Sequence, residues 1–175
     1  QGPTKLDSCF INFLVADTTK PFLVNGLRGN SRLKSFKSRI YDSTESGNRR
    51  VLEFAGALRE NKGLVELDLN HYFKMSDETW DAVCDSLKTH PTLQVLSLQS
   101  IWLCGKEGLK SRIPALLRML KMNTTIHTMN LHPSYSTQEL FRGLVLPYLE
   151  TNKLRPRIRA IQQTRPVAYR SKVLG

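Results

Sequence analysis

Apolar residues recur along the chain in a short unit of the form L-x-x-L-x-L. Six copies of this unit, three clear and three looser, begin at Leu64, Leu93, Ile126 and at Leu6, Leu33 and Arg155. Successive copies begin 27, 31, 29, 33 and 29 residues apart. A polar side chain stands three positions before most of them, at Asn30, Asn61, His90, Asn123 and Asn152. Short alternation of apolar and polar residues predicts a β-strand in each copy.

Between the copies lie stretches with the apolar spacing of one buried helix face, which predicts helices over 51–58, 80–87, 113–120 and 140–149. Ser76 and Ser136 are candidate N-caps, and Glu139 completes a capping box with the second. Pro114 is compatible with a helix that begins close to it. Pro147 is expected to bend or end the fourth helix.

A strand and a helix that recur about every 29 residues indicate a stack of units, with a parallel sheet inside and helices outside. The copies resemble the leucine-rich repeats of the ribonuclease-inhibitor type, found also in NOD-like receptors and, in a shorter form, in the tropomodulin C-terminal domain. The resemblance implies an α/β fold. We therefore expect a right-handed leucine-rich-repeat solenoid of about five to six irregular repeats, with parallel strands on the concave side and helices on the convex side.

The chain departs from that family three positions after the last apolar residue of a copy. The family usually has Asn or Cys there, whereas this chain has Tyr41, Tyr72, Ile101 and Ser134. We expect residues 1–3 to be the remnant of an expression tag, residues 4–161 to form the solenoid, and residues 162–175 to be a basic cap or the start of a further segment.

Few signals for catalysis are present. The chain contains no phosphate-binding glycine loop and no H-E-x-x-H sequence. Cys84 shares an apolar helix face with Trp80 and Leu87, which predicts a core position rather than a nucleophile. We therefore predict no enzymatic activity, no cofactor and no metal site.

The three cysteines include no C-x-x-C pair, and this odd number favours an intracellular location, cytoplasmic or nuclear. The longest apolar run, Cys9 to Ala16, is short and contains Asn12, so no membrane span is predicted.

Residues that flank the apolar positions of a strand point away from the helices and line the concave face. The candidate partner-binding residues on this face are Lys37, Arg39, Glu66, Asp68, Asn70, Gln99, Asn130 and His132. This polar and varied set suits a protein partner. The alternative is an ordinary solvated face, on which Lys37 opposite Asp68 is only a cross-strand ion pair.

Positive charge is concentrated in the second part of the chain. The formal net charge is +11, and residues 101–175 contain 13 Lys and Arg against three Asp and Glu. The candidate site for an anion or an acidic partner comprises Arg155, Arg157, Arg159, Arg165, Arg170 and Lys172. A strand would present the first three on one side, where they could bind phosphates or carboxylates. The alternatives are a polar cap at the end of the solenoid and a charged edge that prevents aggregation.

The sequence thus favours a non-catalytic leucine-rich-repeat module that mediates protein–protein interaction, as part of a larger receptor, adaptor or effector-like protein. The alternative is a basic module that binds nucleic acid or another polyanion through the C-terminal Arg cluster. Tyr169 is the one aromatic residue among these basic residues, whereas single-strand binders usually supply several stacking platforms. A structural spacer between missing domains is a third possibility.

Overall fold

Strand and helix alternate along the chain, and the strands form one parallel sheet. The computed structural model describes residues 8–13, 20–40, 45–69, 76–98, 105–130 and 135–164. Five strands stand in the sheet in chain order: β1 (Ser8–Phe13), β2 (Ser35–Ile40), β3 (Glu66–Asp68), β4 (Val95–Ser97) and β5 (Thr128–Asn130). Because each strand is followed by a helix before the next strand, neighbouring strands run in the same direction.

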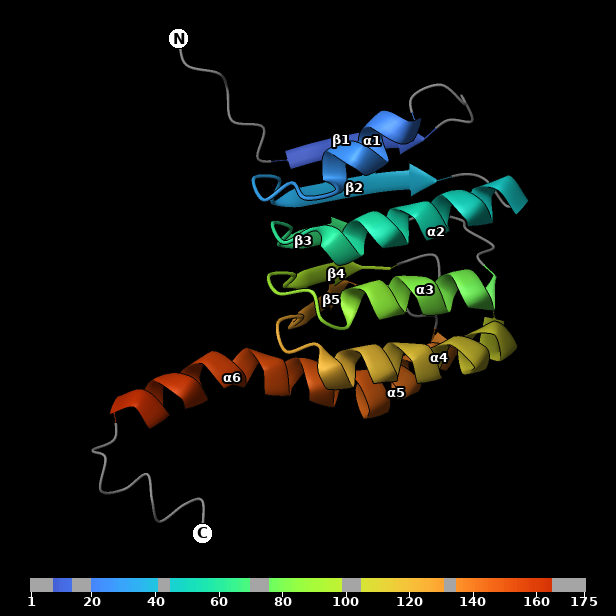
Figure 1. Cartoon of the computed structure of the whole chain (residues 1–175). Coiled ribbons are helices and arrows are strands. Elements are labelled where there is room, and N and C mark those ends of the chain that lie inside the picture. Colours follow the sequence, from blue (N-terminus) through green and yellow to red (C-terminus); the bar gives the residue numbers. More distant parts are fainter. Residues whose placement is uncertain are drawn as a thin grey trace.

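Helices cover one side of this sheet (Figure 1). The first four are α1 (Lys20–Leu27), α2 (Glu45–Glu60), α3 (Asp77–Leu87) and α4 (Gly105–Met122). After β5 the chain forms α5 (Tyr135–Leu140), a π-helical turn η2 (Phe141–Val145) and the long helix α6 (Leu146–Thr164). None of the helices within the described ranges combines the length and the apolar character needed to cross a membrane.

The core lies between the sheet and the helices. Phe36, Leu67, Leu96 and Met129 stand in register on β2 to β5, one apolar residue from each copy. The first three are at most 1% exposed and Met129 is 8% exposed. Side chains from the buried helix faces complete this core, among them Trp80 of α3 at 1% exposure. The predicted position of Cys84 in the core is confirmed by its 3% exposure.

The polar residues that precede the copies form an asparagine ladder, by which we mean Asn30, Asn61, His90, Asn123 and Asn152. Asn61 shows the full pattern. Its Nδ2 donates to the carbonyls of Leu27 and Asn30 at 2.7 and 2.8 Å, and its Oδ1 accepts the backbone N–H groups of Gly63 and Leu64, both at 2.9 Å. One buried side chain therefore holds its own turn and joins it to the preceding turn.

His90 occupies the third position of the ladder and makes only part of these bonds. Its Nδ1 accepts the backbone N–H of Leu93 at 3.2 Å, which requires that nitrogen to be unprotonated. Its Nε2 is buried and has no hydrogen-bond partner among the described residues. Burial lowers the pKa of His90, because the charged imidazolium would lose its hydration. Position 90 thus anchors its own turn without bonding through its side chain to the preceding turn.

The expected sixth strand is wrong, because Arg155, Pro156 and Arg157 lie inside helix α6. In the earlier copies the second residue donates its N–H to the preceding turn: Val65 to the carbonyl of Lys34 at 2.8 Å, and His127 to that of Gln94 at 3.1 Å. The matching residue of the sixth copy is Pro156, which has no N–H to donate. Arg155 also stands where the other copies begin with an apolar residue. This copy therefore lacks both the backbone N–H bond to the preceding turn and the apolar side chain at its first position.

The predicted right-handed leucine-rich-repeat solenoid of five to six repeats is therefore corrected. The chain forms a mixed α/β domain with a five-stranded parallel sheet, and it continues into a projecting helix where another unit was expected. The physical reason is the loss of strand-forming groups at the sixth copy, described above.

The structure also corrects two expectations about prolines. Helix α4 begins at Gly105, so Pro114 lies in its interior rather than near its start. Pro147 is the second residue of α6 and does not end the helix. The turn before it is widened, since the N–H of Leu146 bonds to the carbonyl of Phe141, five residues back. The N-cap at Ser76 is confirmed, because its Oγ accepts the N–H of Thr79 at 3.2 Å.

Candidate protein-binding surfaces

Exposed apolar side chains gather on the last helical segment. The large apolar residues that are exposed in the described ranges are Leu52, Met122, Leu144, Leu146, Leu154 and Ile158. Four of these six belong to η2 and α6. Leu154 is 46% and Ile158 is 49% exposed, and their i, i+4 spacing places them on one face of α6. Leu146 lies about two turns earlier and is rotated by about 80° from Leu154 around the helix axis. We call Leu154 and Ile158 the α6 surface.

Helix α6 is fixed to the domain at its beginning and projects beyond it (Figure 1). Leu149 and Asn152 are each 3% exposed and lie on the side opposite the α6 surface. Asn152 Nδ2 donates to the carbonyls of Asn123 and Ile126 at 2.9 and 2.8 Å, which attaches the helix to the turn before β5. After Asn152 the helix continues to Thr164 and projects beyond the strands (Figure 1), so the α6 surface lies on the projecting part of α6.

The basic residues of α6 do not form the row that a strand would have made. Successive residues of a helix are rotated by about 100°, so position 157 lies on the side of α6 opposite positions 155 and 159, which are one turn apart. The side chains of Arg157 and Arg159 lie outside the described residues. Lys153 is exposed, and Arg155 is half-buried with no hydrogen-bond partner for its Nε in the described part of the chain. Of the remaining members of the predicted cluster, Arg165, Arg170 and Lys172 lie outside the described residues.

The sheet brings several predicted concave residues together. Lys37, Asp68 and Asn130 stand in one row across β2 to β5, and Glu66 lies in the neighbouring row. Lys37 is opposite Asp68 in register, and its Nζ forms an ion pair with Glu66 Oε1 at 3.6 Å. Both side chains of that pair are more than a third exposed, so the pair contributes little stability.

The other four candidates for this face are only partly described or not described. Arg39 belongs to β2, but its side chain lies outside the described part of the structure. Asn70, Gln99 and His132 lie entirely outside the described residues. Glu66 also accepts a hydrogen bond from Ser35 Oγ at 2.9 Å, and Asn130 Nδ2 donates to Ser97 Oγ at 3.0 Å. The described part of the sheet face that points away from the helices is thus polar, and several of its side chains form hydrogen bonds with one another.

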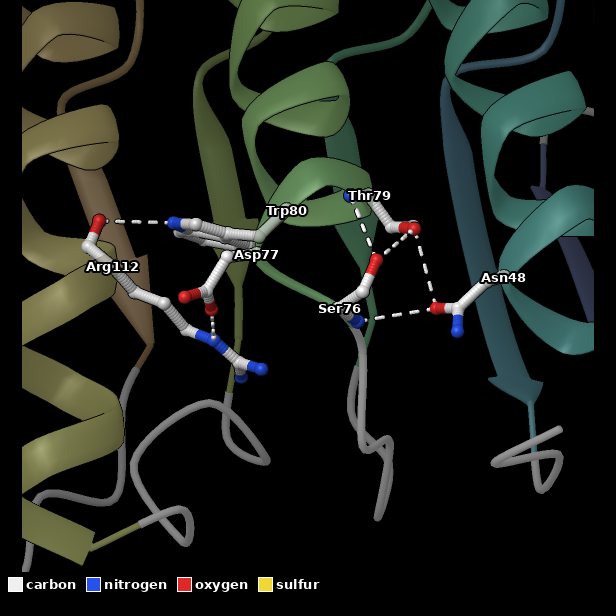
Figure 2. A network of polar contacts seen from close by, with 6 residues as sticks. All are labelled: Asn48, Ser76, Asp77, Thr79, Trp80 and Arg112. Carbon is white, nitrogen blue, oxygen red and sulfur yellow. Dashed lines mark hydrogen bonds and ion pairs between the residues drawn. The ribbon is translucent and has the colours of Figure 1, made fainter. Parts of the chain in front are cut away.

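A polar network links the helices α2, α3 and α4 (Figure 2). Asn48 of α2 accepts the N–H of Ser76 at 3.1 Å and the hydroxyl of Thr79 at 3.2 Å, which joins α2 to α3. Trp80 Nε1 donates to the carbonyl of Arg112 in α4 at 2.9 Å. Arg112 Nε lies 3.4 Å from Asp77 Oδ1, which adds a charged link between α3 and α4.

The residues of this network make structural contacts. The described residues contain few features that would support catalysis or metal binding. Burial in the core, with a smaller effect of the Asp81 carboxylate, raises the pKa of Cys84 far above its ordinary range. A thiol held protonated in this way is not a nucleophile. No group of three His, Cys, Asp or Glu in the described ranges is arranged to hold a metal ion.

Comparison with known proteins finds similarity at the level of structure. No protein-family model and no curated protein matches the sequence. Among solved structures, the leiomodin-1 actin-binding site 2 fragment superposes with a TM-score of 0.65 at 20% identity, covering 91% of this chain and 87% of that one. The C-terminal domain of tropomodulin from Caenorhabditis elegans gives a TM-score of 0.66 at 16% identity, covering 91% and 92%. At these identities the likeness concerns the fold.

These neighbours overturn the expected resemblance to ribonuclease-inhibitor-like leucine-rich-repeat proteins. The match extends over nearly the whole chain, and it is to the leiomodin and tropomodulin domain rather than to a long repeat solenoid. The description of the chain as a leucine-rich-repeat solenoid is therefore wrong. The helix α6 in place of a sixth strand is the feature that most clearly separates the structure from the expected array.

The α6 surface is not among the binding sites that the sequence predicted. In a strand that begins at Arg155, Ile158 holds the fourth position of the unit and would face the helices, and Leu154 lies outside that copy. The signal was present in the i, i+4 spacing of Leu154 and Ile158, which is typical of a helix. Pro156 between them concealed it, because a proline normally argues against a helix interior.

Proposed function

We propose that this chain is a non-catalytic module that binds another protein through the α6 surface. The observation that carries the proposal is the exposure of Leu154 and Ile158, 46% and 49%, on a helix that projects from the domain. Apolar side chains gathered on an accessible, rigid element are typical of protein-binding sites. The basic residues of the same helix, Lys153 among them, favour a partner with acidic groups around an apolar site.

Actin is the first partner to test. The leiomodin-1 fragment, which has a similar fold, is named as an actin-binding site. A shared fold does not fix a shared partner, so actin enters as a candidate to be measured. An intracellular location and membership of a larger receptor, adaptor or effector-like protein remain predictions that accompany this proposal.

The decisive experiment compares two variants in an actin-binding assay. The double substitution Leu154→Ser and Ile158→Ser should weaken binding at least about tenfold, because it removes the apolar contacts and leaves the buried side of α6 unchanged. The matched control is Leu52→Ser, a 38% exposed leucine on α2. Unfolding curves should show that both variants are folded. Equal binding by the double variant and the parent would contradict the α6 surface.

If the parent does not bind actin, the same pair of variants serves in a search for other partners. Loss of a captured protein with the double variant, but not with the control, would keep the proposal and change the partner. The concave residues Lys37, Glu66, Asp68 and Asn130 form a second predicted contact surface on the sheet, for which charge reversal at Lys37 is the test.

Polyanion binding is the second candidate, supported by 13 Lys and Arg against three Asp and Glu in residues 101–175. It differs from protein binding in its response to salt. Affinity for nucleic acid falls steeply with salt as phosphate counterions return, whereas a largely apolar interface is much less sensitive. A fluorescent oligonucleotide that remains bound at physiological salt, and is released by Arg155→Glu with Arg157→Glu and Arg159→Glu, would favour this alternative.

A further inference from the structure

Strand β5 is the last strand of the sheet, and within the described residues it pairs with β4 alone. The N–H of Thr128 bonds to the carbonyl of Gln94, and the carbonyl of Asn130 accepts the N–H of Leu98. Because backbone groups alternate in direction along a parallel strand, the N–H and carbonyl of Met129 point away from β4. Met129 is 8% exposed, whereas its counterparts Phe36, Leu67 and Leu96 are at most 1% exposed.

The earlier turns show what this edge is built to accept. One carbonyl of each turn takes the N–H groups of two successive residues from the next copy. Lys34 accepts from Val65 and Glu66 at 2.8 and 2.9 Å. Val65 in turn accepts from Gln94 and Val95 at 2.8 and 3.0 Å, and Gln94 accepts from His127 and Thr128, both at 3.1 Å.

The next carbonyl in this series belongs to His127. Its own chain would have to supply the N–H groups of residues 156 and 157. The first of these is Pro156, which has none, and both lie in α6. The sixth copy of the unit therefore cannot supply this pair of hydrogen bonds to the carbonyl of His127.

We propose that the free edge of β5 binds an extended segment of a partner protein by strand addition, parallel to β5. The repeated pattern dictates the chemistry of this segment. It needs N–H groups at its second and third positions, and therefore no proline at either of them, together with apolar residues at its first, fourth and sixth positions. A partner segment needs the room of one strand only, whereas a second copy of the chain would also have to place its α1 beside α6. This edge is separate from the α6 surface and does not depend on the proposed function.

The test uses a peptide whose register is known. The probe is the capped peptide of residues 61–69, Asn-Lys-Gly-Leu-Val-Glu-Leu-Asp-Leu, added to the isotopically labelled chain. We expect a saturable shift of the Met129 amide resonance and slower hydrogen exchange of that amide. The same peptide with Val65→Pro should bind at least about tenfold more weakly, because it lacks the N–H that the His127 carbonyl would accept.

The controls separate this site from its alternatives. The double substitution Leu154→Ser and Ile158→Ser should bind the peptide as the parent does, so failure of the α6 proposal leaves this test intact. Protection of the Met129 amide in the free chain equal to that of Thr128 would overturn the proposal, because the edge would already be covered. Equal affinity for the proline peptide would also overturn it. A Met129 shift that grows with protein concentration without peptide would assign the edge to a second copy, against the proposal.

Discussion

Asn61 and Asn152 occupy the same position in two copies of the unit, and the chain continues differently after each of them. At Asn61 helix α2 has just ended, and the side chain bonds both to the preceding turn and to its own turn. Asn152 donates two hydrogen bonds, to the carbonyls of Asn123 and Ile126, while α6 continues through the residue to Thr164. One asparagine ends a structural unit, and the other only attaches a helix.

An asparagine at the ladder position is therefore not sufficient to make the residues after it form a strand. The turn after Asn61 also has Leu64, which is 0% exposed, and Val65, whose N–H reaches the preceding turn. Asn152 is followed at these two positions by Arg155 and Pro156. A buried apolar residue and one backbone donor decide between strand and helix at this point.

The largest effect is expected from removing a complete ladder position. Asn61→Ala should lower the free energy of unfolding by about 3 to 4 kcal/mol. Asn61 is 0% exposed, and its removal leaves the two carbonyls and the two N–H groups that it bonds without their partner. Urea unfolding followed by the fluorescence of buried Trp80 measures this change. Asn25→Ala, on the exposed side of α1, is the matched control and should be nearly neutral. Similar losses in both variants would refute the role of the ladder.

A smaller effect is expected at the attachment of α6. Asn152→Ala removes two donated hydrogen bonds and leaves no turn of its own to collapse, so the loss should be about 1 to 2 kcal/mol. The same urea experiment gives the value. A loss as large as that of Asn61→Ala would mean that Asn152 holds more of the structure than its bonds indicate.

Replacing the exceptional member of the ladder should have the opposite sign. His90→Asn should stabilise the fold by about 1 kcal/mol, because an asparagine amide at that position can donate to the carbonyls of Leu58 and Asn61, as Asn61 does to those of Leu27 and Asn30. Thermal unfolding of the two proteins side by side measures the gain. A lower melting temperature for the variant would show that the imidazole packs better than the amide bonds.

The smallest effect concerns pH. The pKa of His90 is lowered from its ordinary value of 6.5 by burial, so the unfolded chain takes up a proton there before the folded chain does. The contribution of this group to stability is therefore complete above that value and declines as the pH falls through it. Between about pH 7.5 and pH 6 the parent should lose up to about 1 kcal/mol more than His90→Asn. Parallel pH profiles for the two proteins would show that His90 does not titrate in this way.

Much of the alternation could be predicted from the apolar pattern, because the copies that begin at Leu33, Leu64, Leu93 and Ile126 contain the buried strand residues that pack against the helices. The end of the array could not. Ile158 fits the period of a strand as well as that of a helix, and only the missing donor at Pro156 and the charge of Arg155 distinguish the two. Likewise, the register of Lys37 with Asp68 could be predicted, whereas the ion pair of Lys37 with Glu66 depends on side-chain reach, which the pattern does not contain.

The order β1-β2-β3-β4-β5 also has a consequence for how the chain acquires its structure. Among the described strands, each pairs only with strands about 29 residues away, so each step of assembly closes a loop of similar, moderate length. No pairing between these strands joins one end of the sheet to the other, so assembly can start at any adjacent pair and spread in both directions. The boundary before His90 lacks the buried ladder bonds to the preceding turn, and its side-chain bonds are those of Thr92 Oγ1 to the carbonyls of Lys62 and Leu64, at 3.2 and 2.8 Å. We therefore expect this boundary to form late in folding and to open first in the native state, ahead of the boundaries held by Asn61 and Asn123.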